Sequence, residues 1–221
     1  MTLAELIAAF RLAADDRVTP YLWSDAEVAG YFADAESEAC IRARLLWDET
    51  TVGVAVIGLA ATAWVRLHPA ILEVSWARLA SQPDRPLQQR PHAVLDRTWP
   101  GWESITGDPL AYYVAGGRLR LYPAPTRPND TLYLGVYRTP LLALSANALG
   151  ASPEIAEPHH LRLLDWALHR AYAKRDEDAF DPGRSERHRQ LFDAAFGPRS
   201  AGSALRQQLE QKRHVVTAIC F

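Results

Sequence analysis

The sequence contains little cysteine and no long hydrophobic run. Only two of its 221 residues are cysteine, Cys40 and Cys220, and their wide separation does not suggest the disulfide framework of a small secreted domain. No apolar stretch approaches the roughly 20 residues that a membrane-spanning helix needs. The first residues, MTLAELIAAFRLAADD, carry acidic side chains and lack the basic start and apolar stretch of a signal peptide. We therefore expect a soluble protein with free thiols that is made inside a cell.

An excess of positive charge is also missing. The chain has 24 basic and 26 acidic residues, and its net charge is -2. A protein that wraps duplex DNA needs a basic surface, so this class is disfavoured. Short basic clusters occur at 187–190 and 211–214, but Glu186, Asp193 and Glu210 dilute them. Each cluster is better interpreted as the solvated face of a helix than as a nucleic-acid contact.

Common catalytic motifs are absent as well. The sequence has no G-x-S-x-G, no phosphate-binding loop, no Rossmann glycine pattern and no cysteine pair at metal-binding spacing. Chemistry-bearing side chains, three histidines among them, concentrate in PEIAEPHHLRLLDWALHRAYAKRDED, residues 153–178. On a helical wheel these histidines point in different directions, so they cannot converge on one metal ion. No metal and no cofactor is expected, and the chain is not expected to be an enzyme.

Asp165 and His169 are the strongest alternative to that conclusion. At a spacing of four residues they could supply two metal ligands, but a zinc site needs three or four. We favour a surface ladder of Arg162, Asp165 and His169 along the border of a bundle helix. The same wheel puts His160 on the opposite border and assigns the apolar face to Leu161, Leu164, Leu168, Ala171 and Tyr172.

Helices are predicted at both ends of the chain. Thr2 and Glu5 form a capping-box pattern before an apolar stripe at helical spacing. Ser24 and Glu27 repeat the pattern before a narrow helix-packing seam. A third helix is expected from His159 to about residue 175. A fourth is expected with Asp181 as its cap and Pro182 in its first turn, and it ends at 197–198. The seam of the second helix comprises Val28, Phe32, Ala35, Ala39 and Leu46.

The middle of the chain reads as β structure. Valine, threonine, tryptophan and tyrosine dominate there, and glycine and proline interrupt them. Gly116 and Gly117 indicate a tight hairpin, because paired glycines supply the positive φ angles that such turns need. TLYLGVY alternates with period two, so it predicts a strand with one buried face. HAVLDRTWPGWES is ambiguous and fits one helical turn. Strands are expected at 52–57, 64–67, 71–79, 111–114, 118–122 and 131–137.

These elements predict an α+β fold with a helical bundle and an antiparallel β-rich insertion. Residues 1–49 and 151–200 are expected to form the bundle, and residues 50–150 the insertion. Residues 201–221 are left as a C-terminal extension.

Four segments in this order resemble the tailed-bacteriophage head-to-tail adaptor proteins, also called connector or head-completion proteins. They are LWSDAEVAGYFADAESEACIRARLL, PAILEVSWARL, GDPLAYYVAGGRLRLYPAPTRPNDTLYLGVYRTPL and PEIAEPHHLRLLDWALHRAYAKRDEDAFDPGRSERHRQLFDAAFG. The resemblance covers roughly residues 20–197. Its motifs are packing patterns and contain no catalytic signature.

The resemblance implies a structural virion protein. It implies a ring, usually of twelve copies, that binds the portal protein, the neighbouring adaptor copies and a tail or nozzle protein. Genomic DNA would pass through the ring lumen without specific binding, to which a near-neutral surface is suited. No cofactor, catalysis or membrane is implied. The protein would be made in the cytoplasm of the host bacterium and reside at the head-tail interface of the virion.

The apolar C-terminus, HVVTAICF, is the best candidate for a partner-binding segment. Val215, Val216, Ile219 and Phe221 either complete a strand of their own fold, or fray, or lie against the portal or an adjacent copy. Two other functions remain as alternatives. They are a small metal-dependent hydrolase that uses Asp165 and His169, and a DNA-binding module of the packaging apparatus.

The tyrosines of the insertion also have two interpretations. Most are expected to pack in the core or across strands, and an exposed subset could receive tail components. The five are Tyr112, Tyr113, Tyr122, Tyr133 and Tyr137.

Overall fold

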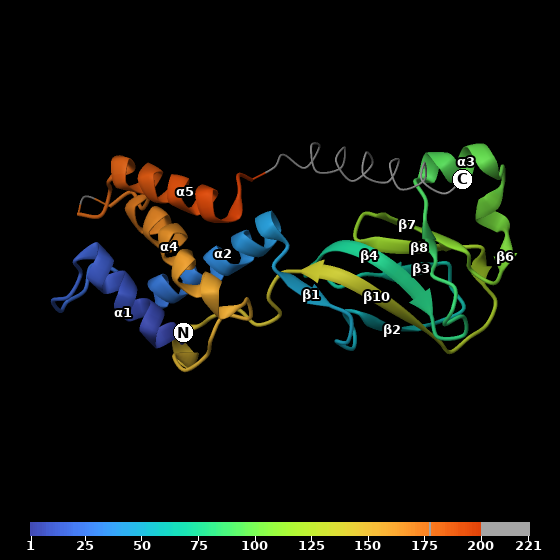
Figure 1. Ribbon diagram of the computed structural model, residues 1–221, viewed down its shortest axis with the longest axis horizontal. Coiled ribbons are helices and arrows are strands. Elements are labelled where there is room, and N and C mark those ends of the chain that lie inside the picture. The colour runs from blue at the N-terminus through green and yellow to red at the C-terminus, as the bar shows by residue number, and fades with distance from the viewer. Residues whose placement is uncertain (177, 200–221) are drawn as a thin grey trace. The chain divides into compact units, whose positions relative to one another are not determined.

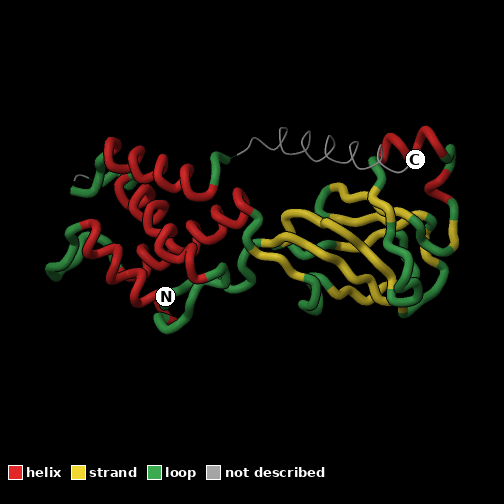
Figure 2. Tube along the Cα trace, viewed as in Figure 1, coloured by secondary structure: helices red, strands yellow, loops and turns green. Residues whose placement is uncertain are grey.

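The computed structural model describes residues 1–176 and 178–199, and the chain divides into two compact units (Figure 1). The helical unit contains Met1–Ala43 and the described residues from Leu142 onward, whereas the β-sheet unit is Arg44–Leu141. Figure 2 shows helices in the first unit and mostly strands in the second. The prediction of an α+β fold with antiparallel sheets is confirmed.

Four α-helices build the described part of the helical unit, and α4 packs against the other three. Both predicted capping boxes are present. At the first helix, the amide of Glu5 donates to Oγ1 of Thr2 at 3.4 Å and Oε2 of Glu5 accepts from the Thr2 amide at 2.8 Å. At the second, the corresponding bonds between Ser24 and Glu27 measure 3.2 and 2.9 Å. The helices are α1 (Leu3–Ala14), α2 (Asp25–Ala43), α4 (Leu163–Tyr172) and α5 (Pro182–Phe196), with short 3₁₀ turns η2 (Ala146–Ala148) and η3 (Glu157–Arg162).

The seam of α2 is buried as predicted, but it ends earlier. Val28, Phe32, Ala35 and Ala39 are each fully buried. Leu46 was expected to continue this seam, and that expectation is wrong. Arg44 adopts a left-handed conformation with φ of 54°, which ends the helix, and Leu46 starts a strand.

The apolar face of the third predicted helix is rotated from its expected position. Leu161 is 54% exposed, whereas His160 is buried and bonded to the backbone of Ile155 at 2.8 Å through Nε2. The reason is that the helix begins as the 3₁₀ turn η3. Such a turn advances about 120° per residue and shifts the phase of a wheel drawn at 100°. The side chains buried in α4 are Leu163, Ala167, Leu168, Ala171 and Tyr172.

Strand β10 (Asp130–Arg138) is the centre of sheet A, the first of two larger sheets. It pairs antiparallel with β4 (Ile71–Leu79), β1 (Leu46–Asp48) and β2 (Val56–Leu59). The predicted strand at 52–57 is displaced, because residues 51–55 form a turn before β2.

Sheet B contains the predicted glycine hairpin. β7 (Ala111–Ala115) and β8 (Arg118–Tyr122) pair antiparallel, and Gly116 and Gly117 between them have φ of 57° and 71°. The hairpin prediction is therefore confirmed. The other members of sheet B are β3 (Trp64–Arg66) and the two-residue edge strand β5 (Gln88–Gln89), and a small parallel pair joins β6 (Thr106–Gly107) to β9 (Ala124–Pro125).

The main core of the β-sheet unit lies between sheets A and B. Leu132, Leu134 and Val136 on β10 are fully buried there, as the period-two pattern predicts. A second cluster covers the outer side of sheet B. It includes Leu95 from α3 (His92–Thr98) and Trp102 from the 3₁₀ turn η1 (Trp102–Ser104). Sheet B is therefore covered on both faces.

Candidate functional site

Asp165 and His169 do not form a shared site. Oδ1 of Asp165 lies 3.0 Å from Nδ1 of His188 on α5. Nδ1 of His169 lies 3.0 Å from the carbonyl oxygen and 2.9 Å from the hydroxyl of Ser185, also on α5. The predicted ladder is wrong in its partners, since Asp165 and His169 each bond to the neighbouring helix, and Arg162 lies exposed on η3. These contacts fasten α4 to α5.

The environment of His169 suits a structural role. Its partial burial disfavours the imidazolium form and lowers the pKa of His169. In the described residues, 1–176 and 178–199, no three His, Cys, Asp or Glu side chains are grouped so that they could hold a metal ion. The hydrolase alternative has no support in this geometry.

Side chains of the basic cluster at 187–190 form ion pairs within the helical unit. Arg189 pairs with Glu186 at 2.6 Å and with Asp193 at 3.0 Å, and the bond from Arg189 lowers the pKa of Glu186 to about 2. Asp193 also pairs with Arg42 of α2. These partners neutralise Arg189, and His188 bonds to Asp165, so the exposed Arg187 is left as a single basic side chain, which does not favour the cluster as a DNA contact.

The predicted partner-binding segment lies outside the described residues. Val215, Val216, Ile219 and Phe221, and the basic cluster at 211–214, all belong to the 200–221 stretch. The proposed role of this segment therefore stays a prediction.

The outer face of sheet A carries a row of aromatic side chains. Trp47 on β1 contacts Tyr137 edge to face at a centroid distance of 5.0 Å, and Trp76 on β4 lies over Gly135. A Cβ atom at Gly135 would lie 2.1 Å from Nε1 of this indole, so only glycine admits the ring there. Tyr133 continues the row, and it is 38% exposed. We call Trp47, Trp76, Tyr133 and Tyr137 the aromatic row.

The five tyrosines of the predicted insertion divide as expected. Tyr112, Tyr113 and Tyr122 are buried, whereas Tyr133 is exposed and Tyr137 is half-buried. An exposed subset therefore exists on one sheet face.

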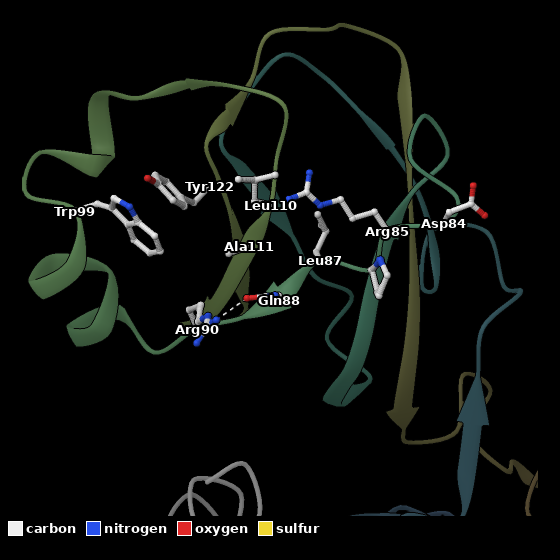
Figure 3. A pocket seen from close by; sticks show the side chains of 10 residues that line it. Asp84, Arg85, Leu87, Gln88, Arg90, Trp99, Leu110, Ala111 and Tyr122 are labelled. Carbon is white, nitrogen blue, oxygen red and sulfur yellow. Dashed lines mark hydrogen bonds between the residues drawn. The ribbon is translucent and has the colours of Figure 1, made fainter. Parts of the chain in front are cut away.

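A concave site lies at the β5 edge of sheet B (Figure 3). Its volume is about 580 Å³. Tyr122 and Trp99, whose rings are 5.3 Å apart, form one wall, and the side chain of Arg85 extends toward Leu110 from the other side. The remaining lining residues are Asp84, Pro86, Leu87, Gln88, Arg90 and Ala111, and we call the whole set the arginine-aromatic pocket.

The backbone holds this pocket firmly. The amide of Leu110 donates to the carbonyl of Tyr122 at 2.7 Å, and the amide of Gln88 donates to the carbonyl of Leu110 at 3.0 Å. The amide of Arg90 donates to the carbonyl of Tyr112 at 2.8 Å. The wall from β7 and β8 and the wall from β5 are thus parts of one hydrogen-bonded sheet.

The pocket combines apolar surface with an excess of positive charge, since Arg85 and Arg90 stand against one acidic lining residue, Asp84. Trp99 is 39% exposed and Leu110 is 37% exposed. Over the described ranges, Arg85 and Arg90 form no ion pair with a carboxylate; Arg90 donates to Oε1 of Gln88 at 2.5 Å. Such a surface favours a ligand that is apolar and carries a carboxylate. The sequence reasoning missed this pocket, and its only local signal is the pair of arginines, Arg85 and Arg90, on either side of a short segment.

The family of the chain follows from comparison with known protein families. A family model described as SU10 adaptor protein matches residues 1–215. The chain belongs to the SU10 adaptor protein family. This is a family of phage head-to-tail adaptors, so the resemblance identified from the sequence is confirmed. No curated protein matches the chain.

Membership describes the adaptor as a structural component of a phage virion. The tyrosines, the aromatic row and the pocket are therefore better considered as surfaces for other proteins than as catalytic groups. Among the helices of the described part, none combines the length and apolarity that crossing a bilayer requires.

Proposed function

We propose that this adaptor forms a ring between the portal protein and the tail or nozzle of a phage, and that the ring has twelve copies. The observation that carries the proposal is the family match over residues 1–215, which extends through both units. In this role the protein extends the channel through which the genome leaves the head. Catalysis is not part of the proposal.

Contacts between ring neighbours need two different surfaces, because a ring closes through head-to-tail interfaces. The charges of the two units suit this requirement. Residues 1–43 and 142–199 carry 17 acidic and 11 basic side chains, whereas residues 44–141 carry 8 acidic and 10 basic ones. An acidic surface of one copy and a basic surface of the next attract each other and disfavour wrong pairings.

The aromatic row is a second support for a protein-binding role. Tryptophan and tyrosine are enriched among the residues that dominate binding energy at protein interfaces. Trp47 and Tyr133 are 42% and 38% exposed on the outer face of sheet A. The neighbouring Glu73 and Arg44 pair at 3.4 Å, which reduces the cost of covering this face.

Passage of DNA through the lumen without specific binding fits the overall charge. A net charge of -2 offers no general affinity for phosphates, whereas a strongly basic lining would retain the genome.

The C-terminal segment is proposed to bind a partner in the assembled particle, through Val215, Val216, Ile219 and Phe221. These apolar side chains end a stretch that begins with polar and basic residues. Deletion of residues 215–221 should leave a folded chain with weaker binding to its assembly partners. An unfolded deletion product would show instead that the segment belongs to the core.

The native mass of the purified protein, alone and mixed with the portal protein of the same phage, tests the proposal. We expect the adaptor to join the portal in equal copy number, with twelve adaptor copies in the complex. A native complex of another defined stoichiometry would overturn the ring of twelve. A chain that stays monomeric with the portal under all conditions would overturn the ring function itself.

A further inference from the structure

The arginine-aromatic pocket has the features of a receptor for a chain terminus. Its lining includes the apolar Leu87 and Leu110, the aromatic Trp99 and Tyr122, and two arginines that pair with no carboxylate in the described ranges. Arg85 and Arg90 can each donate charge-assisted hydrogen bonds to a carboxylate. Capture of a C-terminal carboxylate together with its last side chain is a recurring mode of peptide recognition.

The C-terminus of this same chain has the complementary chemistry. It ends in AICF, so Phe221 carries both an aromatic ring and the terminal carboxylate. Ile219 precedes Phe221 by two positions. Val215 and Val216 extend the apolar character further from the end. An aromatic ring can pack against Trp99 and Tyr122 while the carboxylate meets the guanidinium groups.

We propose that the arginine-aromatic pocket of one copy binds the C-terminal residues 214–221 of a neighbouring copy. The proposal rests on the proposed ring, in which each copy has a neighbour. It identifies the partner of the segment as a second adaptor chain.

The length of the segment permits such a link. Twenty-two residues, 200–221, follow the last described residue, Arg199. Fully extended, 22 residues span roughly 70 Å. A folded unit of about 100 residues has a radius of gyration of about 13 Å, so the segment can reach across to an adjacent copy.

Disulfide trapping tests the contact in the full-length protein, with oxidised glutathione added as the oxidant that accepts the two electrons of disulfide formation. One tagged chain carries Gln88→Cys in the pocket together with Cys220→Ser, and its partner is the unmodified chain with Cys220. Cys40 is fully buried, so it does not compete for the reaction. The matched control replaces Gln88→Cys by Ser75→Cys, because Ser75 is also exposed and lies on β4, away from the pocket residues.

We expect the mixed disulfide to form about tenfold faster or more with the pocket cysteine than with the control, since docking raises the local thiol concentration. A peptide of residues 214–221 with serine for cysteine should suppress the reaction. Equal rates at both positions, or no mixed disulfide, would overturn the proposal. So would a chain with both Gln88→Cys and Cys220 that closes only on itself. Asp84→Cys gives a second pocket position if Gln88→Cys fails to fold.

The carboxylate and the aromatic wall are tested by peptide binding. A fluorescent peptide of residues 214–221 should bind the full-length chain carrying Phe221→Asp, whose own terminus no longer competes. Amidation of the peptide or Trp99→Ala should each weaken binding by about tenfold or more, as expected when a charge-assisted bond or an aromatic anchor is lost. Trp47→Ala is the matched control, because Trp47 is similarly exposed on another sheet. Equal affinity for the amidated peptide would refute recognition of the carboxylate.

The two proposals fail separately. If the wild-type chain joins the portal in equal copy number but Gln88→Cys traps no Cys220, the proposed function stands and this inference is wrong. Absence of any portal complex would remove the proposed ring, whatever the isolated peptide does.

Discussion

Asp48 provides a sensitive test of how the β-sheet unit is held together. Its Oδ1 accepts from the amides of Thr50 and Thr51 at 3.1 and 3.0 Å, and its Oδ2 accepts from Nε of Arg138 at 2.7 Å. The carboxylate therefore joins the turn after β1 to the end of β10. The side chain of Asp48 is only 4% exposed, so water weakens these bonds little.

The magnitude follows from the pKa of Asp48. Burial alone would raise this pKa, but the bonds from Thr51, Arg138 and Thr50 outweigh it and lower the pKa from 3.8 to about 2. A shift of nearly two units corresponds to roughly 2 kcal/mol of stability. Because the folded pKa is the lower one, this stability is fully present above about pH 4 and is lost as the pH falls toward 2.

Urea unfolding followed by tryptophan fluorescence from pH 7 to pH 2 measures the effect. Five of the seven tryptophans lie in residues 44–141, so the signal reports mainly on the β-sheet unit. Asp48→Asn should lower the free energy of unfolding at pH 7 by roughly 2 kcal/mol or more and flatten its decline between pH 4 and 2. Asp108→Asn, which alters an exposed pair with Arg127, should change it by less than about 0.5 kcal/mol. An unchanged pH dependence in Asp48→Asn would refute the reasoning.

Three further changes test other parts of the molecule. Gly135→Ala should destabilise the β-sheet unit by about 1–3 kcal/mol because its Cβ overlaps an indole ring, whereas Gly58→Ala on β2 meets no atom within 4 Å and should be nearly neutral in thermal unfolding. The buried carboxylate of Glu36 accepts hydrogen bonds from two backbone amides in the segment before η3. Glu36→Leu should therefore lower the free energy of unfolding by about 1–3 kcal/mol per lost bond. Glu36→Gln should lower it less in the same assay. Asp165→Ala combined with His169→Ala should leave the metal content unchanged by elemental analysis.

Each of these expectations has a contrary outcome. Equal melting temperatures for Gly135→Ala and Gly58→Ala would mean that the position of the Trp76 indole does not require glycine at residue 135. A fully stable Glu36→Leu variant would show that the two amides find other partners. Stoichiometric zinc that disappears with Asp165 and His169 would restore the hydrolase alternative.

The sequence predicts best where a local pattern has only one physical interpretation. A capping box such as Thr2 with Glu5 depends on residues three apart, and paired glycines such as Gly116–Gly117 permit a conformation that few residues share. Alternation in β10 is equally local, and Leu132 is fully buried as it requires. These features could be assigned without knowledge of any distant contact.

The failures arise where distant parts of the chain decide the outcome. The phase of α4 depends on the 3₁₀ turn before it, so the wheel misplaces Leu161 and His160. Asp165 selects His188, a residue 23 positions away, over its neighbours on the same helix. The arginine-aromatic pocket joins Arg85 to Tyr122 from different strands. No periodicity within a single segment predicts a contact between residues that lie far apart in the sequence.

A subunit of the proposed ring must present unlike surfaces, and the β-sheet unit offers candidates for contacts with two different partners. Sheets A and B pack through their inner faces, and the aromatic row occupies the outer face of sheet A. The pocket belongs to the edge of sheet B, where Trp99 follows α3. A single patch would favour a closed pair of copies, because identical surfaces satisfy each other. In the proposed ring the pocket of one copy and the C-terminal segment of the next are the unlike pair that continues head to tail, and the aromatic row is a separate surface for another partner. The same division lets the aromatic row and the pocket be disabled one at a time, so Trp47→Ala and Trp99→Ala should impair different steps of assembly.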